Sequence, residues 1–228
     1  KALMFLGSGS VIHACHHEQD IFKYGGLRKK MPITALTFLV GVLAISGVNF
    51  LSGYYSKDAI LLTAYNSNMP IFILLYAGAI LTALYMFRLY FITFEGESRS
   101  DSSSHAHENG ALMTGPLILL AILSVFGGYH TLFPVSIVES ILPDIELVAA
   151  MPNHMWMIVL GTFAWVVGGI TAKNLFSRVG EDDPLEQKLP VFFALCKSKL
   201  FFDQIYGFYI HRIQDPFTRF IEVMELLF

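Results

Sequence analysis

Long apolar stretches separated by short polar ones dominate this chain. Five apolar segments can be drawn, and we expect each to be helical: residues 1–15, 32–65, 69–94, 111–133 and 154–176. The last three are long enough to cross a hydrocarbon core of about 30 Å at about 1.5 Å per residue, whereas the first covers about half of it. The pattern predicts an all-α fold, a polytopic transmembrane helix bundle over residues 1–176.

The second apolar segment is too long to be one ordinary span. As a straight helix, residues 32–65 would extend about 50 Å. Small and polar residues interrupt it, with Ser-Gly-Val-Asn at 46–49 and Ser-Gly at 52–53. Broken helices persist at membrane depth only where the freed backbone groups are buried in protein or line a wet cavity. We therefore expect one discontinuous helix here, of the kind that marks transport paths.

The pattern changes after the fifth segment. Residues 177–201 form a polar linker and connection, and residues 202–228 carry apolar side chains at helical spacing with polar ones opposite. This predicts a C-terminal amphipathic helix that lies on a membrane surface or along neighbouring subunits. At Asp215-Pro216 we expect an interruption, with Asp capping and Pro starting a second helix.

The charges fit a membrane bundle and orient it. Charged residues make up 14% of the chain, against about 25% in soluble domains. Basic residues fall in alternate connections: loops 16–31 and 95–110 and the stretch after residue 176 carry Lys or Arg, whereas loops 66–68 and 134–153 carry none. The positive-inside rule places the basic loops and the C-terminal tail on the cytoplasmic or matrix side.

Several function classes have no support in the sequence. A net charge of −3 and the absence of a basic block give no footprint for nucleic acid. Cys15 and Cys196 are far apart and form no CxxC pattern, and there is no glycine-rich nucleotide loop. We therefore expect no redox or nucleotide cofactor in this chain.

Lys57 and Asp58 are the main candidates for chemistry. They follow the expected helix break and precede seven further, mostly apolar residues, so they are expected to lie below the membrane surface. In one interpretation Lys57 extends to the outer interface and Asp58 caps the next turn. In the other, a desolvated Lys57 that is tuned by Asp58 binds and releases a proton on a path across the membrane. The spacing alone favours neither.

Other polar residues are weaker candidates. His13 is expected to face the bundle, and Arg88 is expected to extend to the cytoplasmic interface. His105 and His107 are spaced as metal ligands can be, but the surrounding Ser/Asp run indicates a solvated loop. Residues 129–130, Tyr-His, are expected to anchor the outer end of the fourth span.

Several motifs along the chain resemble those of one known family. They are Lys-Ala-Leu-Met-Phe-Leu-Gly-Ser-Gly-Ser-Val-Ile-His at 1–13, His-His-Glu-Gln-Asp at 16–20, Gly-Gly-Leu-Arg-Lys-Lys-Met-Pro at 25–32, Phe-Leu-Ser-Gly-Tyr-Tyr-Ser-Lys-Asp-Ala-Ile-Leu at 50–61, Tyr-Met-Phe-Arg at 85–88, Phe-Glu-Gly-Glu at 94–97, His-Ala-His-Glu at 105–108 and Lys-Leu-Phe-Phe-Asp-Gln-Ile-Tyr at 199–206. With these motifs the chain resembles the antiporter-like subunit 5 (subunit L) of NADH:quinone oxidoreductases, respiratory complex I. The resemblance covers the whole chain and is strongest over residues 1–61.

The resemblance implies a proton-pumping subunit without a redox site of its own. It implies that Lys57 is the terminal proton-transferring residue, that Lys1 belongs to a central hydrophilic axis, and that the path includes Asp58 and the region of His13. Flavin, iron–sulfur clusters and quinone would then be held by partner subunits, with neighbouring antiporter-like subunits and the lipid bilayer as direct partners. The bacterial inner membrane is the expected location, with an organellar membrane as the alternative.

The chain departs from the family pattern at the expected break and in its extent. The family usually has a proline where Asn49 or Phe50 stands here, so Gly47 and Asn49 are expected to supply the flexibility. We expect the sequence to be part of a longer chain, beginning inside a helix and stopping within a lateral helix, and unable to pump alone. Two alternatives stay open: the large subunit of a multi-subunit sodium/proton antiporter, and a structural membrane subunit with Lys57 as an anchor.

Overall fold

The computed structural model describes residues 1–128, 155–176, 186 and 190–227. All regular secondary structure in these residues is helical, which confirms the all-α part of the predicted fold class. The chain divides into two units, residues 1–181 and 182–228, which are described separately.

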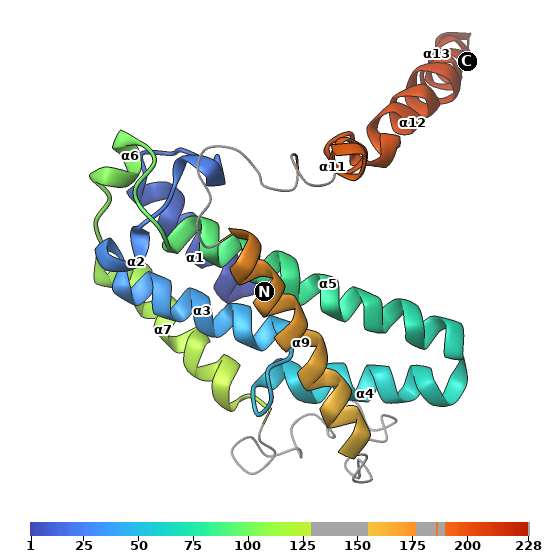
Figure 1. The fold of residues 1–228 in the computed structure, drawn as a ribbon. Helices are drawn as coiled ribbons and strands as arrows, with labels where there is room; N and C mark the ends of the chain where they lie inside the picture. The colour runs from blue at the N-terminus through green and yellow to red at the C-terminus, as the bar shows by residue number, and fades with distance from the viewer. Residues whose placement is uncertain (129–154, 177–185, 187–189, 228) are drawn as a thin grey trace, which may run out of the picture. The chain divides into compact units, whose positions relative to one another are not determined.

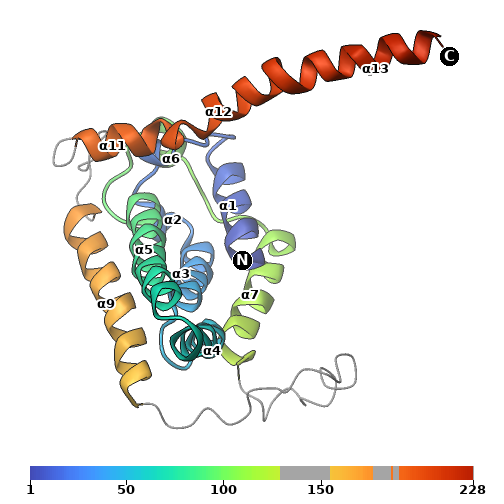
Figure 2. The same ribbon diagram turned by 90° about the vertical axis from the view of Figure 1, so that its right-hand side faces the viewer.

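In its described residues, the first unit consists of six long helices and, near one end, three short helical turns (Figure 1). Figure 2 shows α9, α5 and α3 side by side in that order, with α1 and α7 beyond α3. Two of these helices, α5 and α9, are long and apolar enough to cross a membrane. The long helices are α1 (Ala2–Ala14), α3 (Pro32–Ser46), α4 (Ser52–Ser67), α5 (Met69–Phe94), α7 (Ala111–Phe126) and α9 (Met155–Phe176), and the short ones are η1 (Ile21–Lys23), α2 (Leu27–Lys30) and α6 (Asp101–Ser104).

Helices α3 and α4 occupy the long second segment and are separated at residues 47–51. Gly47 ends α3 in the left-handed conformation, with φ of +83°, which glycine adopts without steric cost. Its N–H donates to the Ala44 carbonyl, and the Val48 N–H donates to the Leu43 carbonyl, as in a Schellman motif. Both helices contact α5, and Figure 1 shows them one after the other along it.

Helices α5 and α9 pack closely because small residues line their contact. Ala164, Gly168 and Ala172 recur every fourth position of α9 and are buried, so they form the small-residue stripe that lets helix backbones approach in membranes. A Cβ atom at Gly168 would lie only 2.6 Å from the Cβ of Ala83 on α5. The two segments are far apart in sequence, and this stripe holds them together.

Helix α7 ends at Phe126, whereas the sequence pattern predicted a helix to residue 133. Two glycines follow, and they lie close to neighbouring groups: a Cβ at Gly128 would be 2.4 Å from the ring of Tyr55 on α4. The apolar pattern continues past the glycines, so it gave no sign of this end. Residues 129–133, including the expected Tyr129-His130 anchor, lie outside the described residues.

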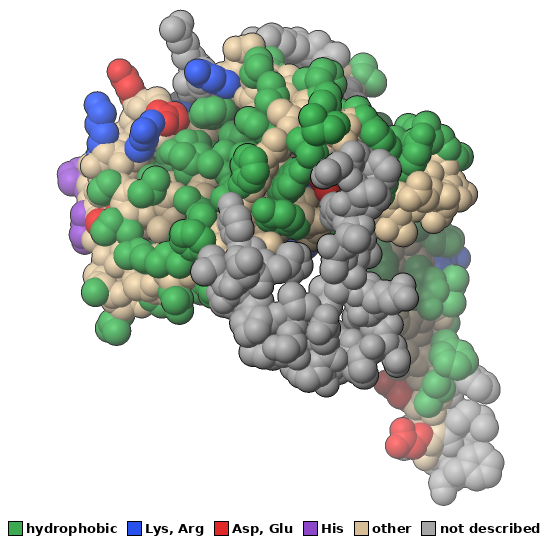
Figure 3. Space-filling model, turned by 90° about the horizontal axis from the view of Figure 1, so that it is seen from below, with side chains coloured by type: hydrophobic (Ala, Val, Ile, Leu, Met, Phe, Trp, Pro, Cys, Tyr) green, Lys and Arg blue, Asp and Glu red, His purple; other side chains and the backbone are tan. Residues whose placement is uncertain are grey.

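The two basic loops meet at one end of the first unit. The Arg28 guanidinium is 2.8 Å from the Glu95 carboxylate, and this hydrogen bond raises the pKa of Arg28. Burial raises the pKa of Tyr24 in the same region to about 12. On the face drawn in Figure 3, charged side chains of this unit gather at the end that carries α2 and α6, while hydrophobic side chains cover much of the rest.

Lys30 ties these loops together through three hydrogen bonds. Its Nζ donates to the Ser98 hydroxyl at 2.8 Å and to the carbonyls of Ser103 and Ser104 at 2.6 and 2.7 Å. Because hydrogen bonds from a charged donor are the stronger kind, this ammonium is a strong link between loop 16–31 and loop 95–110, beside those made by Arg28 and Arg99.

We predict that Lys30→Met loosens loop 95–110. Losing these bonds should cost about 2 kcal/mol of local stability, which corresponds to roughly 30-fold faster proteolytic cleavage of a transiently opened loop. Limited proteolysis of the membrane-embedded complex measures this rate. Lys29→Met is the control, because Lys29 is exposed and adjacent; equal cleavage of the two variants would contradict the prediction.

The second unit consists of consecutive short helices that end in α13. They are α11 (Pro190–Lys197), the 3-10 turn Lys199–Phe201, α12 (Phe202–Tyr209), a π-helical turn (Ile210–Gln214) and α13 (Asp215–Leu227). Many apolar side chains of α12, the π-helical turn and α13 are exposed, including Ile205, Tyr209, Ile213 and Phe217.

The regular α-helix is interrupted just before Asp215-Pro216 and α13 begins at Asp215, but the expected capping by Asp215 is wrong. Asp215 has helical backbone angles, φ −60° and ψ −45°, rather than those of a cap. The wide π-helical turn ends at Gln214, two residues before Pro216. A proline ring clashes with the carbonyl four residues earlier in an α-helix, and a local π-turn is one way in which a helix continues past such a residue.

Candidate functional site

Lys57 lies in the first half of α4, shortly after residues 47–51, which separate α3 from α4 and are called the helix break below. Its side chain is half-buried, and Nζ is buried without a hydrogen-bond partner among the described residues. The aliphatic part packs on the break itself, since a Cβ at Gly47 would be 3.0 Å from Lys57 Cδ and 4.0 Å from Nζ. A side chain at position 47 would therefore displace the lysine, so the glycine serves both the turn and the site.

A cavity of about 300 Å³ brings Lys57 and Lys1 together. Helices α1, α3, α4 and α7 surround it, and its wall includes the hydroxyl side chains of Ser52, Ser56 and Ser124. A cavity of this size has room for several water molecules, each needing two to four polar partners. Two amines and three hydroxyls in one chamber can therefore support a hydrated path between the lysines.

Lys57 also borders a second cavity, of about 340 Å³, between α4 and α5. Its wall is mostly apolar, with Thr82 of α5 as the added hydroxyl residue, and that hydroxyl donates to the Gly78 carbonyl at 2.7 Å. The Lys57 side chain thus borders two cavities, one with serine hydroxyls toward Lys1 and a more apolar one toward α5.

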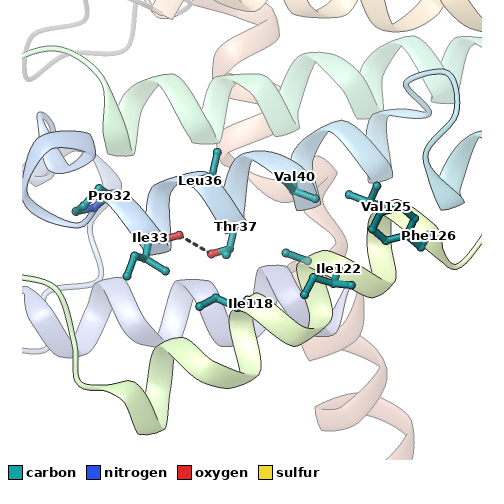
Figure 4. A pocket seen from close by; sticks show the side chains of 10 residues that line it. Pro32, Ile33, Leu36, Thr37, Val40, Ile118, Ile122, Val125 and Phe126 are labelled. Atoms are coloured by element: carbon teal, nitrogen blue, oxygen red, sulfur yellow. Dashed lines mark hydrogen bonds between the residues drawn. The ribbon is translucent and has the colours of Figure 1, made fainter.

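A third hollow of the first unit, larger than these two cavities, has a different character. It is a groove of about 510 Å³ between α3 and α7, and Figure 4 shows the apolar side chains that line it, from Pro32 to Phe126. Its one hydroxyl residue, Thr37, donates to the Ile33 and Thr34 carbonyls. This groove offers no free polar group for proton transfer, so size alone does not locate the site.

Asp58 faces away from Lys57, toward α9. The side chain is buried, the Tyr54 hydroxyl donates a hydrogen bond to it, and a Cβ at Gly161 would lie 3.1 Å from Oδ1. Consecutive residues of a helix point about 100° apart, and the described residues contain no ion pair between Lys57 and Asp58. Asp58 therefore contacts a different helix from the cavity that Lys57 shares with Lys1.

His13 lies at the basic-loop end of α1 and does not face the bundle as expected. Its side chain is exposed, and Nδ1 is 3.1 Å from the Asn109 amide oxygen. A network continues inward from Asn109 through the buried hydroxyls of Ser10 and Thr34 to the carboxylate of Glu108, which also accepts from backbone N–H groups at the start of α3. The structure thus separates His13 from Lys1 and Lys57.

Sequence reasoning missed this network, although Asn109 and Glu108 stand beside the His-Ala-His motif that it noted. The sequence does contain a sign of it: a carboxylate and an amide stand at the end of loop 95–110, just before an apolar helix. Such residues satisfy free N–H groups at helix starts. Apolar side chains separate the network from the lysine cavity, since Phe38 and Met4 are buried between them, against Gly7 and Gly41.

Two further residues that the sequence analysis considered, Arg88 and His105, contact nearby groups of the chain. Arg88 lies over the rings of Phe22 and Phe176, at 5.7 and 5.1 Å from their centroids; Phe22 belongs to the basic loop 16–31. His105 Nδ1 is 2.9 Å from the Ser104 hydroxyl and from the Asp101 carbonyl. Across the part of the chain that the structure describes, no three acidic, His or Cys side chains form a metal-binding group.

Comparison with known families identifies the chain. A family model described as NADH:quinone oxidoreductase/Mrp antiporter, TM, matches residues 1–83. A second, described as NADH dehydrogenase subunit 5 C-terminus, matches residues 85–214, more than half of the chain. The chain belongs to the NADH dehydrogenase subunit 5 family. The resemblance inferred from the sequence motifs is thereby confirmed, and a member of this family is an integral membrane protein.

Curated relatives of the subunit 5 family agree. The chain is 40% identical over 228 residues to the NADH-quinone oxidoreductase subunit L of Rickettsia bellii, covering 92% of this chain and 35% of the relative. It is 49% identical over 150 residues to the subunit L of Rhodobacter capsulatus, covering 58% and 21%. It is 36% identical over 243 residues to the NAD(P)H-quinone oxidoreductase chain 5 of a Picosynechococcus strain, covering 91% and 37%. The chain thus spans between about a fifth and somewhat over a third of these relatives' length.

Proposed function

We propose that this chain is the C-terminal, proton-translocating part of the antiporter-like subunit 5 (L) of an NADH:quinone oxidoreductase. The observation that carries the proposal is the buried Lys57 ammonium near the helix break, which lacks a hydrogen-bond partner in the described residues and lines one cavity with Lys1 and three serines. An amine without a fixed partner binds and releases a proton at little structural cost. Membership of the subunit 5 family supports placing this chemistry in complex I.

In this proposal α3 and α4 are the two halves of one discontinuous membrane helix. The route runs from Lys1 through water held by Ser52, Ser56 and Ser124 to Lys57. It then continues along α4, because the second cavity opens beside the same ammonium. Asp58 is buried next to this route and influences it from the α9 side. His13 lies apart and is not assigned a step.

The remaining components belong to other subunits. We propose that flavin, iron–sulfur clusters and quinone are held by partners, and that this chain contributes proton movement alone. Its neighbours are other membrane subunits, against which the exposed apolar side chains of α12 and α13 are proposed to lie. The names of the bacterial relatives support a plasma-membrane location.

A sodium/proton antiporter subunit is the second candidate, since the family model for residues 1–83 covers both kinds of protein. Sealed vesicles containing the intact complex distinguish the two. We expect quinone reduction to acidify the vesicle interior equally in sodium-free and sodium-containing buffer. Acidification that requires sodium would favour the antiporter, and quinone reduction without acidification would refute proton translocation.

A further inference from the structure

The break between α3 and α4 is attached to α9 by a reciprocal pair of hydrogen bonds. The Asn49 Nδ2 donates to the Thr162 hydroxyl at 2.9 Å, and that hydroxyl lies 3.2 Å from Asn49 Oδ1, to which it can donate in return. The two residues are separated by 113 positions. These are the side-chain hydrogen bonds from residues 47–51 to another helix in the described part of the chain.

The backbone of the break needs such support. Phe50 is a non-glycine residue with φ of +70°, a conformation that ordinary side chains rarely adopt. The hydrogen bonds within the break join neighbouring residues, such as the Leu51 N–H to the Val48 carbonyl at 3.2 Å. An outside contact is therefore needed to hold this conformation relative to the rest of the bundle.

The break in turn positions Lys57. Gly47 packs against the aliphatic part of Lys57, and the ammonium has no partner of its own in the described residues. Its place at the boundary of the two cavities is thus determined by packing on the break rather than by an ion pair. A small shift of residues 47–51 would change which cavity the ammonium faces.

We infer that Thr162 is a positioning residue for Lys57, acting through Asn49 and the helix break. The neighbouring Gly161 faces Asp58, so one turn of α9 contacts both the break and the buried carboxylate that follows the lysine. The inference rests on the proposed function, because it assigns Thr162 a part in the proton transfer that Lys57 is proposed to carry out.

The test compares Thr162→Val with Thr162→Ser in the intact complex in sealed vesicles. Valine keeps the shape without the hydroxyl, whereas serine keeps the hydroxyl. Losing this pair of hydrogen bonds should lower the pumping rate at least about fivefold in the valine variant, and serine should restore it. Thr171→Val, in the same helix and without a hydrogen bond to the break, is the matched control.

A double-mutant cycle with Asn49→Ala isolates the pair. If Thr162 acts through Asn49, the double variant should be no worse than either single one. Equal pumping by the valine and wild-type complexes would overturn the inference, as would additive losses. If Thr162→Val and Asn49→Ala both fail to assemble while Thr171→Val assembles, the contact is structural only and the inference is wrong.

Different experimental outcomes would refute the role of Thr162 and the proposed function. Normal pumping by a Lys57→Met complex would refute the proposed function, and the role of Thr162 with it. Loss of pumping in Lys57→Met together with normal pumping in Thr162→Val would refute only the role of Thr162.

Discussion

Proton pumping is expected to collapse when Lys57 is replaced by Met in the intact complex. Met preserves the length and the apolar body of the side chain but cannot bind a proton. Removing a positioned proton-transfer group slows its step by about a hundredfold or more. Vesicle acidification and quinone reduction should therefore both fall at least about tenfold, because tightly coupled electron transfer cannot proceed when protons do not move. Both rates are measured in the same vesicles, with the amount of assembled complex as reference.

The control for this variant is Lys29→Met. Lys29 is exposed in the basic loop, and the described residues give it no hydrogen bond, so its loss should leave both rates near those of the wild type. If Lys57→Met keeps full pumping and quinone reduction, Lys57 is an interfacial anchor and proton transfer must be assigned to other residues. Loss of assembly in Lys57→Met alone would identify a structural role.

Local rules in the sequence locate much of the fold. Helix α5 covers Met69–Phe94, the same residues as the predicted span, because Asn68 caps its first turn, Pro70 suits an early helical position and charge begins at Glu95. The separation of α3 from α4 falls where glycine and small polar residues interrupt the apolar run. In both cases the information lies within a few residues of the boundary.

Contacts between distant segments could not be predicted in the same way. The stripe of Ala164, Gly168 and Ala172 is visible in the sequence, but apolar periodicity alone does not say which helix it meets. Nor does the pattern show that Gly128 packs on Tyr55, which accompanies the early end of α7. These contacts depend on which helix lies opposite, and the hydropathy pattern of one segment does not identify that helix.

The same distinction applies to the site. Lys57 stands out in the sequence as a charge within an apolar run, but its side-chain direction depends on the rotation of α4 against its neighbours. Asp58, adjacent in sequence, therefore faces α9 instead of pairing with the lysine. His13 was expected to face inward, and the structure instead pairs it with Asn109 outside the bundle, because the returning loop supplies a polar partner there.

The contact between α5 and α9 gives the second large expected effect, in the series Gly168→Ala and Gly168→Leu. A Cβ at this position would lie 2.6 Å from Ala83 Cβ and 2.9 Å from both the Ile80 carbonyl oxygen and the Leu84 nitrogen. Two of these atoms belong to the backbone, so the helices must separate to admit a side chain. We expect alanine to cost about 1–3 kcal/mol and leucine to prevent stable packing of α9 on α5.

Assembly of the complex measures this effect. The fraction of complex recovered intact from membranes, and the temperature at which it dissociates, should fall from wild type to Gly168→Ala and again to Gly168→Leu. Gly115→Ala is the control, since a Cβ at Gly115 on α7 meets no atom within 4 Å and such surface changes usually stay within about 0.5 kcal/mol. Normal assembly of Gly168→Leu would mean that α5 and α9 do not approach through this stripe. The position of Thr162 beside the helix break, which depends on the same helix, would then lose its structural basis.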